Sequence, residues 1–466
     1  MSVTNENRHV DKKFEVPVSV RVPLYPYLTA LFSVLFIAAF LIYIEYDAAS
    51  AVLFAGAFII IPLLALRDSI VFDGKRIIRT GLIPRMWANF LSQRNRLKLT
   101  DIENVETHAT RTLKRGSKVT YHYSTIISGK GAAFHISSGG EDYRRMVRTL
   151  LPLLHDEVLD TRSIEMRDYL CEKNETLTKA AFMNIPPTDV LESSLAVLNK
   201  GTRKENAVNT QDLSEESVKR SQELRQMANE LRISGSLLQA IEAFRRALLI
   251  RPRDGWLLLE FARCLESFAG SERDRKASKK AAAVMRLAER RAGVDGHLLA
   301  RMGETYFQFG DARRAAIMFE RSKEAIGDSF RALRGMAEIA LREGKIAHVI
   351  LNFSSANSVA QTSALRRWTQ RETDYFDHLN SNDEYMELEV SRVNLLEKLL
   401  RIRKTALRIC IFGLPMIIVG IMLEENFIAN AGWAICGAAL LLSLALIIGS
   451  RMMETRIPFK LMEEED

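Results

Sequence analysis

Residues 224–252 read LRQMANELRISGSLLQAIEAFRRALLIRP. Apolar residues recur three or four positions apart on both sides of Gly235, which is the spacing of one face of an α-helix. Glycine commonly ends a helix because it adopts a left-handed conformation without steric cost. The stretch therefore predicts two amphipathic helices joined by a tight turn. The residues expected to pack between them are Leu224, Met227, Ala228, Leu231, Ala240, Phe244 and Ala247.

The same arrangement recurs further along the chain. Gly310 and Gly344 also end helix-like runs and lie 34 residues apart. Paired helices with this period resemble the tetratricopeptide repeat. Gly235 and Gly310 lie 75 residues apart, seven more than two periods of 34, so we expect a loop insertion at 270–275. About four repeats are predicted over 218–356, enough to form a stable stack.

The first helices of such repeats line a concave surface. Arg225 and Asn229 lie one helical turn apart, so both can reach one carboxylate. This resembles the clamp that some tetratricopeptide proteins use for peptide C-termini, although Glu260 stands where that clamp has an asparagine. We therefore expect a general acidic-peptide groove, and the alternative is a solvated face without a ligand. The groove residues are Arg225, Asn229, Arg232, Arg263, Arg331 and Arg334.

Residues 273–291 carry a second concentration of positive charge. The pattern predicts one helix, and basic helices of this kind face solvent, acidic proteins or nucleic acid. Nucleic-acid binding is therefore an alternative function for this segment. Its basic residues are Arg273, Arg275, Lys276, Lys279, Lys280, Arg286, Arg290 and Arg291.

Upstream, residues 69–138 alternate apolar and polar side chains between turns such as Asp73-Gly74, which predicts short antiparallel strands. Residues 141–154 then read as one amphipathic helix that caps a small sheet or barrel. The order of an apolar hairpin, Ile70, Asp73-Gly74, Ile77, Thr80-Gly81 and LKLTDIENV at 97–105 resembles bacterial pleckstrin-homology-like domains. That resemblance implies a module that binds lipid or protein.

A basic cluster lies between two of these strands, at a loop expected near the membrane. It is either a patch for anionic lipid headgroups or a solvated hairpin tip. Its members are Arg111, Lys114, Arg115 and Lys118.

Two pairs of apolar segments flank the soluble regions. Residues 22–44 are uncharged and long enough to cross a bilayer of about 30 Å, and 48–66 follow after a very short turn. Residues 409–423 and 427–449 predict a second hairpin. A cleaved signal peptide is the alternative for the first segment, because Ala49-Ser50-Ala51 resembles a cleavage site.

Basic residues flank both hairpins on one side, whereas the turns at 45–47 and 424–426 are acidic or neutral. By the positive-inside rule, both termini and the region 67–408 face the cytoplasm. No charged residue lies in the middle of a segment, which disfavours ion or proton transport. Residues 384–408 predict a long helix that continues into the third segment, and its apolar positions favour packing or self-association.

Motifs for catalysis or metal binding are absent from the sequence. It has no phosphate-binding glycine loop, no His-Glu-x-x-His and no paired-cysteine spacing among its four cysteines. We expect no enzyme, no cofactor and no metal. The net charge of +8 suits an acidic partner or anionic lipid, as well as an ordinary cytoplasmic surface.

The sequence thus predicts a multidomain membrane protein with two α-helical transmembrane hairpins, a small β domain capped by one helix, and an all-α tetratricopeptide-repeat solenoid. We expect a scaffold of the bacterial inner membrane that recruits a protein partner with an acidic segment; an accessory subunit of a transporter or envelope-assembly complex is another alternative. The predicted segments are an N-terminal tail 1–21, hairpin 22–66, β domain 67–156, helical connector 157–199, linker 200–217, repeats 218–356, connector 357–383, long helix 384–408, hairpin 409–449 and C-terminal tail 450–466.

Overall fold

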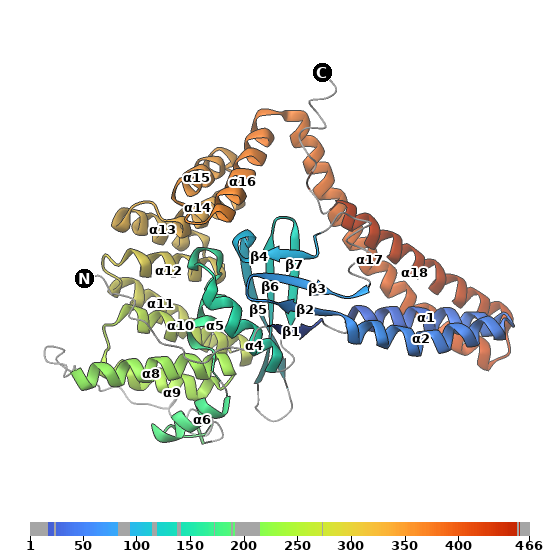
Figure 1. Ribbon diagram of the computed structural model, residues 1–466, viewed down its shortest axis with the longest axis horizontal. Helices are drawn as coiled ribbons and strands as arrows, with labels where there is room; N and C mark the ends of the chain where they lie inside the picture. Colours follow the sequence, from blue (N-terminus) through green and yellow to red (C-terminus); the bar gives the residue numbers. More distant parts are fainter. Residues whose placement is uncertain are drawn as a thin grey trace. The chain divides into compact units, whose positions relative to one another are not determined.

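The computed structural model describes residues 17–22, 25–82, 94–113, 119–137, 141–171, 173–187, 190–191, 215–272, 274–453 and 456 (Figure 1). They fall into two compact units. The first comprises the described parts of Met1–Ala30, Phe58–Glu343 and Asn352–Thr369, and the second those of Leu31–Ala57, Gly344–Leu351 and Gln370–Asp466.

The first unit begins with two antiparallel sheets. One holds β1 (Val18–Arg21), β2 (Ser69–Phe72), β3 (Arg76–Thr80) and β4 (Arg96–Lys98) in that order. The other holds β5 (Asn104–Leu113), β6 (Val119–Gly129) and β7 (Ala132–Ser137). No ladder joins the two sheets among the described strands, so they do not form a closed barrel.

Strand β1 corrects the predicted N-terminal tail, because it lies within 1–21. It pairs with β2 in antiparallel register, Val18 opposite Phe72. Val18 and Val20 are buried while Ser19 and Arg21 are exposed, as expected of a strand with one face on a core. Four residues are too few to give a clear periodic pattern, and the partner strand lies almost fifty residues away.

Helix α4 (Glu141–Leu150) follows the second sheet and packs on both sheets' core. Its buried residues Tyr143, Met146, Val147 and Leu150 lie three or four positions apart, so one face supplies the apolar contact. The predicted order of strands followed by one capping helix is therefore present. The short 3₁₀ turns Leu151–Leu153 and Asp156–Val158 lead from α4 into the connector.

Paired helices make up most of the rest of this unit. The glycines that precede second helices, Gly235, Gly310 and Gly344, have φ of 91°, 85° and 71°, as tight left-handed turns require. The helices are α8 (Glu215–Ser234), α9 (Leu237–Ile250), α10 (Gly255–Glu272), α11 (Arg275–Arg291), α12 (Gly296–Gln308), α13 (Ala312–Ile326), α14 (Phe330–Arg342), α15 (Ile346–Val359) and α16 (Ser363–Ser381). The start of α15, up to Leu351, and α16 from Gln370 onward belong to the second unit.

The predicted loop insertion at 270–275 is wrong. Gly270 lies inside α10, and Asp274 caps the start of α11. Helices α10 and α11 have 18 and 17 residues, compared with 13 and 15 for α12 and α13. The seven extra residues therefore lengthen the helices of the second pair.

The β domain and the repeats are not independent modules. Phe330 and Leu333 of α14, together with Leu365 of α16, belong to the same hydrophobic core as the strands and α4. The Tyr123 hydroxyl of β6 also donates a hydrogen bond to the carbonyl of Ile233 in α8. Most of the linker 200–217 lies outside the described residues, but the shared core shows that it does not separate two freely moving domains.

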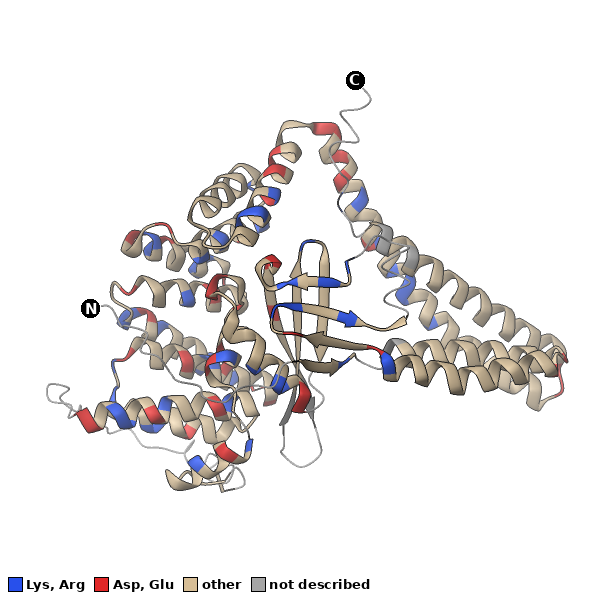
Figure 2. Ribbon diagram, in the orientation of Figure 1, with Lys and Arg blue, Asp and Glu red and all other residues tan. Residues whose placement is uncertain are grey.

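The second unit contains apolar helices. Besides the parts of α15 and α16 named above, its helices are parts of α1 (Tyr25–Tyr43) and α2 (Asp47–Arg67), together with α17 (Asp383–Met422) and α18 (Asn426–Met453). Among the described residues, three helices are long and apolar enough to cross a membrane, at Asp47–Arg67, Asp383–Met422 and Asn426–Ile447, and Tyr27–Tyr43 is a shorter apolar helix. Figure 2 shows α1, α2 and α18 uncharged over most of their length, whereas α17 carries charged residues over its first half and is uncharged from Ile409 onward. The predicted long helix 384–408 continues without a break in α17, as expected.

The two hairpins pack against each other within this unit. Trp433 of α18 lies among Phe36, Phe40 and Tyr43 of α1, with ring centroids 4.9, 5.4 and 5.9 Å away. Offset and edge contacts between aromatic rings at these distances stabilise helix packing. Trp433 therefore anchors one hairpin on the other.

Candidate functional site

A short helix from the connector lies on the predicted groove. Helix α5 (Thr161–Tyr169) begins at Asp160, whose carboxylate accepts a hydrogen bond from the Ser163 amide at 2.8 Å. Its Ile164 and Met166 are buried in the core of the β domain. The opposite side of α5 faces the repeat helices, so this segment joins the β domain to the array (Figure 1).

Glu165 stands at the centre of that contact. Its carboxylate pairs with Arg232 Nη2 at 2.8 Å and with the guanidinium of Arg263. Burial alone would raise the pKa of Glu165, but the charges of Arg232 and Arg263 outweigh burial, and the pKa lies below its ordinary value. Burial lowers the pKa of Arg263 to about 10 despite the Glu165 carboxylate, so Arg263 remains a cation at neutral pH.

Arg225 and Asn229 do bind one carboxylate, which is that of Glu260 on α10. Arg225 donates from Nε to Oε2 at 2.6 Å and from Nη2 to Oε1 at 2.5 Å, while Asn229 Nδ2 donates to Oε2 at 2.8 Å. The Tyr169 hydroxyl of α5 donates to the same carboxylate at 3.1 Å. Glu260, the residue that departs from the clamp pattern, thus occupies the place that a peptide carboxylate would take.

Arg331 completes the contact at the other end of α5. It pairs with Glu304 and donates from Nη2 to the Asp156 carbonyl at 3.1 Å, while the Thr161 hydroxyl donates to Glu304. Charges of opposite sign therefore meet at three places along this contact. Glu165 and Glu260 are buried and Glu304 is half-buried, and each pair offsets part of the cost of desolvation.

Arg334 lies apart from α5. Its Nε donates to Glu338 at 3.0 Å, and its guanidinium stacks over the Trp368 ring at 5.3 Å from the centroid. Four of the six predicted groove residues thus bind Glu165 of α5 or Glu260, and a fifth, Arg331, binds Glu304 and the Asp156 carbonyl beside α5. The open acidic-peptide groove expected from the sequence is filled in this structure, since an external peptide would have to displace α5.

Sequence reasoning missed Glu165 and Tyr169 as groove contacts. The connector pattern predicts a helix but gives no sign that Glu165 within it is buried, because the arginines that pair with Glu165 lie about seventy and one hundred residues further on.

The predicted lipid patch falls outside the residues that the structure describes. This holds for Lys114, Arg115 and Lys118, and for the side chain of Arg111 in β5.

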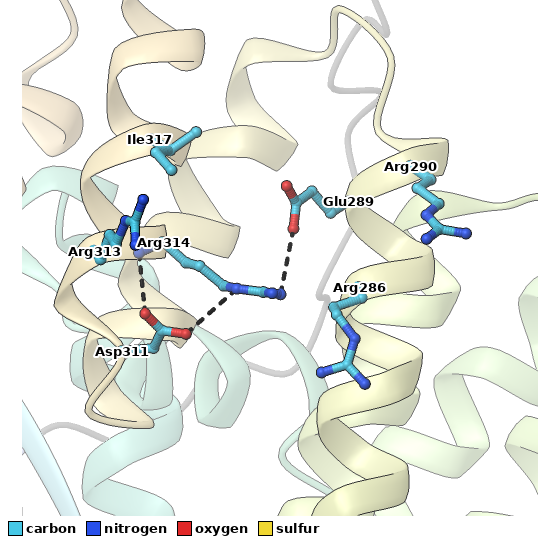
Figure 3. Close-up of a pocket in the computed structure, with 7 residues that line it drawn as sticks. All are labelled: Arg286, Glu289, Arg290, Asp311, Arg313, Arg314 and Ile317. Carbon is cyan, nitrogen blue, oxygen red and sulfur yellow. Dashed lines mark hydrogen bonds and ion pairs between the residues drawn. The ribbon is translucent and has the colours of Figure 1, made fainter.

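A basic groove lies on another face of the array, between α11 and α13. Figure 3 shows Arg286 and Arg290 extending from α11, and Arg313 and Arg314 from α13. The groove has a volume of about 560 Å³ and is lined also by Glu289, Asp311 and Ile317. The predicted basic helix 273–291 thus forms one wall, apart from Arg273, which lies outside the described residues.

Metal-binding clusters are absent from the part of the chain that the structure describes: no three His, Cys, Asp or Glu side chains gather there in a way that could hold an ion. The described cysteines Cys171, Cys264, Cys410 and Cys436 are free thiols.

Comparisons with known proteins identify no family. No protein-family model matches the chain, and no curated protein matches it. Among solved structures, the crystal structure of the APC/C hetero-tetramer Cut9–Hcn1 is similar to it, with 15% sequence identity and a TM-score of 0.28. That match covers 66% of this chain and 64% of the other, so it spans less than two thirds of that protein. The similarity is too low to carry a conclusion, and the helical-repeat architecture rests on the helix pairs described above.

Proposed function

We propose that this protein is a membrane-anchored scaffold, and not an enzyme, that holds a cytoplasmic protein partner on its repeat array. One observation carries the proposal: a stack of helix pairs, which presents long surfaces suited to proteins, shares its chain with helices long and apolar enough to cross a membrane. Because α5 covers the predicted groove, we expect the partner to bind another face of the array.

The β domain supports the same proposal as a second module. Its strands followed by α4 agree with the order that the pleckstrin-homology-like resemblance implies, and its shared core with α14 and α16 would hold it at a fixed place on the array. In this proposal the protein lies in a bacterial inner membrane with both termini and the first unit's soluble parts in the cytoplasm. The basic residues that flank the hairpins support that orientation.

The experiment is quantitative proteomics of membranes from cells that express the protein natively and from cells that lack it. We expect at least one peripheral protein to leave the membrane fraction when this chain is absent, and to return when the full chain is restored. If the peripheral proteins on the membrane are the same in both strains, the scaffold function is wrong.

A further inference from the structure

The basic groove between α11 and α13 contains charges that the fold does not use. Three of its arginines are exposed and have no ion pair or side-chain hydrogen bond to any residue that the structure describes. They are Arg286, Arg290 and Arg313. Arg314, in contrast, already forms ion pairs within the groove: its Nε lies 3.5 Å from Asp311 Oδ2 and its Nη1 lies 3.9 Å from Glu289 Oε2 (Figure 3). Three guanidinium groups therefore remain available for an anion.

The row of exposed basic residues continues along α11 beyond Arg286 and Arg290. Lys276, Lys279, Lys280, Arg286 and Arg290 recur at intervals close to one or two turns of α11, so they form one exposed stripe. Like charges this close on one helix repel one another. A bound anionic segment would relieve that repulsion.

The other lining residues indicate which anion fits. Glu289 and Asp311 would repel an unbroken row of phosphates, and the seven lining residues include no aromatic ring on which a nucleobase can stack. Ile317 is 42% exposed within the groove and offers an apolar contact. A protein segment with spaced carboxylates and apolar side chains satisfies all of these features, because guanidinium binds carboxylate in two parallel hydrogen bonds.

We infer that this groove, defined by Arg286, Arg290 and Arg313, docks an acidic segment of a protein partner. The inference rests on the proposed scaffold function and names the surface and partner chemistry for it. Carboxylates one helical turn apart on the partner would meet Arg286 and Arg290, which are themselves four residues apart on α11.

The probe is a fluorescein-labelled 16-residue helical peptide with glutamates four residues apart, added to the full chain in detergent micelles. Fluorescence anisotropy measures its affinity. We expect R286E/R290E/R313E to weaken binding about tenfold or more, and the glutamine triple at these positions to weaken it less, because it removes charge without adding repulsion.

A matched control reverses three other exposed charges on the array, in K219E/R220E/R245E. Lys219 and Arg220 line a second surface groove that also holds Glu216 and Glu223, and Arg245 already pairs with Glu242 at 3.0 Å. We expect this control to bind the peptide within about twofold of the unchanged chain, since its three cations lie outside the basic groove.

Three results would overturn the inference. The first is equal weakening in both triple variants, which would mean that only total charge matters. The second is no weakening in the groove variant. The third is tighter, groove-dependent binding of a single-stranded oligonucleotide, or of phosphatidylglycerol added to the same micelles, which would assign the groove to nucleic acid or lipid. None of these results bears on whether a peripheral protein leaves the membrane without this chain, so the scaffold function is tested separately.

Discussion

Glu165 is the residue on which the contact between connector and repeats depends. It is one carboxylate shared by two buried arginines, Arg232 and Arg263. Removing the charge leaves both guanidinium groups without their counterion in a site that excludes water, and such a loss is far more costly than the loss of a surface pair.

We therefore expect Glu165→Gln to lower the free energy of unfolding by about 3–5 kcal/mol, because it leaves buried charge uncompensated. Urea denaturation of the full chain in detergent micelles measures this change. Glu175→Gln is the control: Glu175 is exposed and pairs with Lys179 at 3.2 Å, so its loss should cost at most about 1 kcal/mol. Similar losses for both variants would contradict a special role for Glu165.

Cys264 gives a second residue-scale prediction. It is fully buried in α10, and burial raises the pKa of its thiol to about 12. Since the thiolate is the form that reacts, iodoacetamide at pH 8 should leave Cys264 unmodified in the native chain and modify it in urea. Peptide mass spectrometry measures the modified fraction. Arg290→Cys places an exposed thiol on the neighbouring helix α11 as a positive control, and equal rates at the two positions would refute the prediction.

At the scale of elements, local pattern predicts the first helix pair correctly, but it predicts neither the greater length of α10 and α11 nor the contacts of α5. Leu224, Met227, Ala228 and Leu231 recur at helical spacing, and all four are buried. The contact of α5 depends instead on ion pairs between Glu165 and two arginines far along the chain. A short stretch of sequence does not contain both partners of such a pair. Arg225 and Asn229 were correctly expected to share a carboxylate, but the sequence could not reveal that the fold supplies it from Glu260.

Helices α17 and α18 approach closely at glycines. A Cβ atom at Gly413 would lie 2.5 Å from Cys436 Sγ, and one at Gly432 would lie 2.7 Å from the Ile417 amide nitrogen. A Cβ atom at Gly437 would have nothing within 4 Å, so this glycine does not belong to the contact. Small residues are needed where backbones meet, as in other apolar helix pairs.

We expect Gly413→Leu to separate α17 from α18 and lower their packing stability by about 1–3 kcal/mol or more, the usual cost of overpacking. Gly437→Leu adds the same side chain to open space and should have little effect. Thermal unfolding of both variants in detergent, followed by protease resistance of the C-terminal hairpin, compares them directly. A Gly413→Leu chain as stable as Gly437→Leu would mean that the close approach is not needed.

For the whole molecule, the proposed orientation depends on charges at the ends of the apolar helices. Arg67 is the last residue of α2, and four basic residues precede the apolar half of α17: Arg401, Arg403, Lys404 and Arg408. The turns between paired helices contain Glu45, Glu424 and Glu425. Moving several cations across a bilayer is unfavourable, so the basic ends should remain in the cytoplasm and both turns should reach the opposite side.

Single cysteines in a chain whose four native cysteines are serine test this orientation. We expect Tyr46→Cys and Glu425→Cys to react with a membrane-impermeant maleimide on intact spheroplasts, because each lies in a turn between apolar helices. Arg275→Cys on α11 should react only after the membrane is permeabilised. Labelling of Arg275→Cys in intact spheroplasts would invert the orientation. If neither turn is labelled, the hairpins do not cross the membrane. The apolar helices would then hold the array on the membrane from its cytoplasmic side.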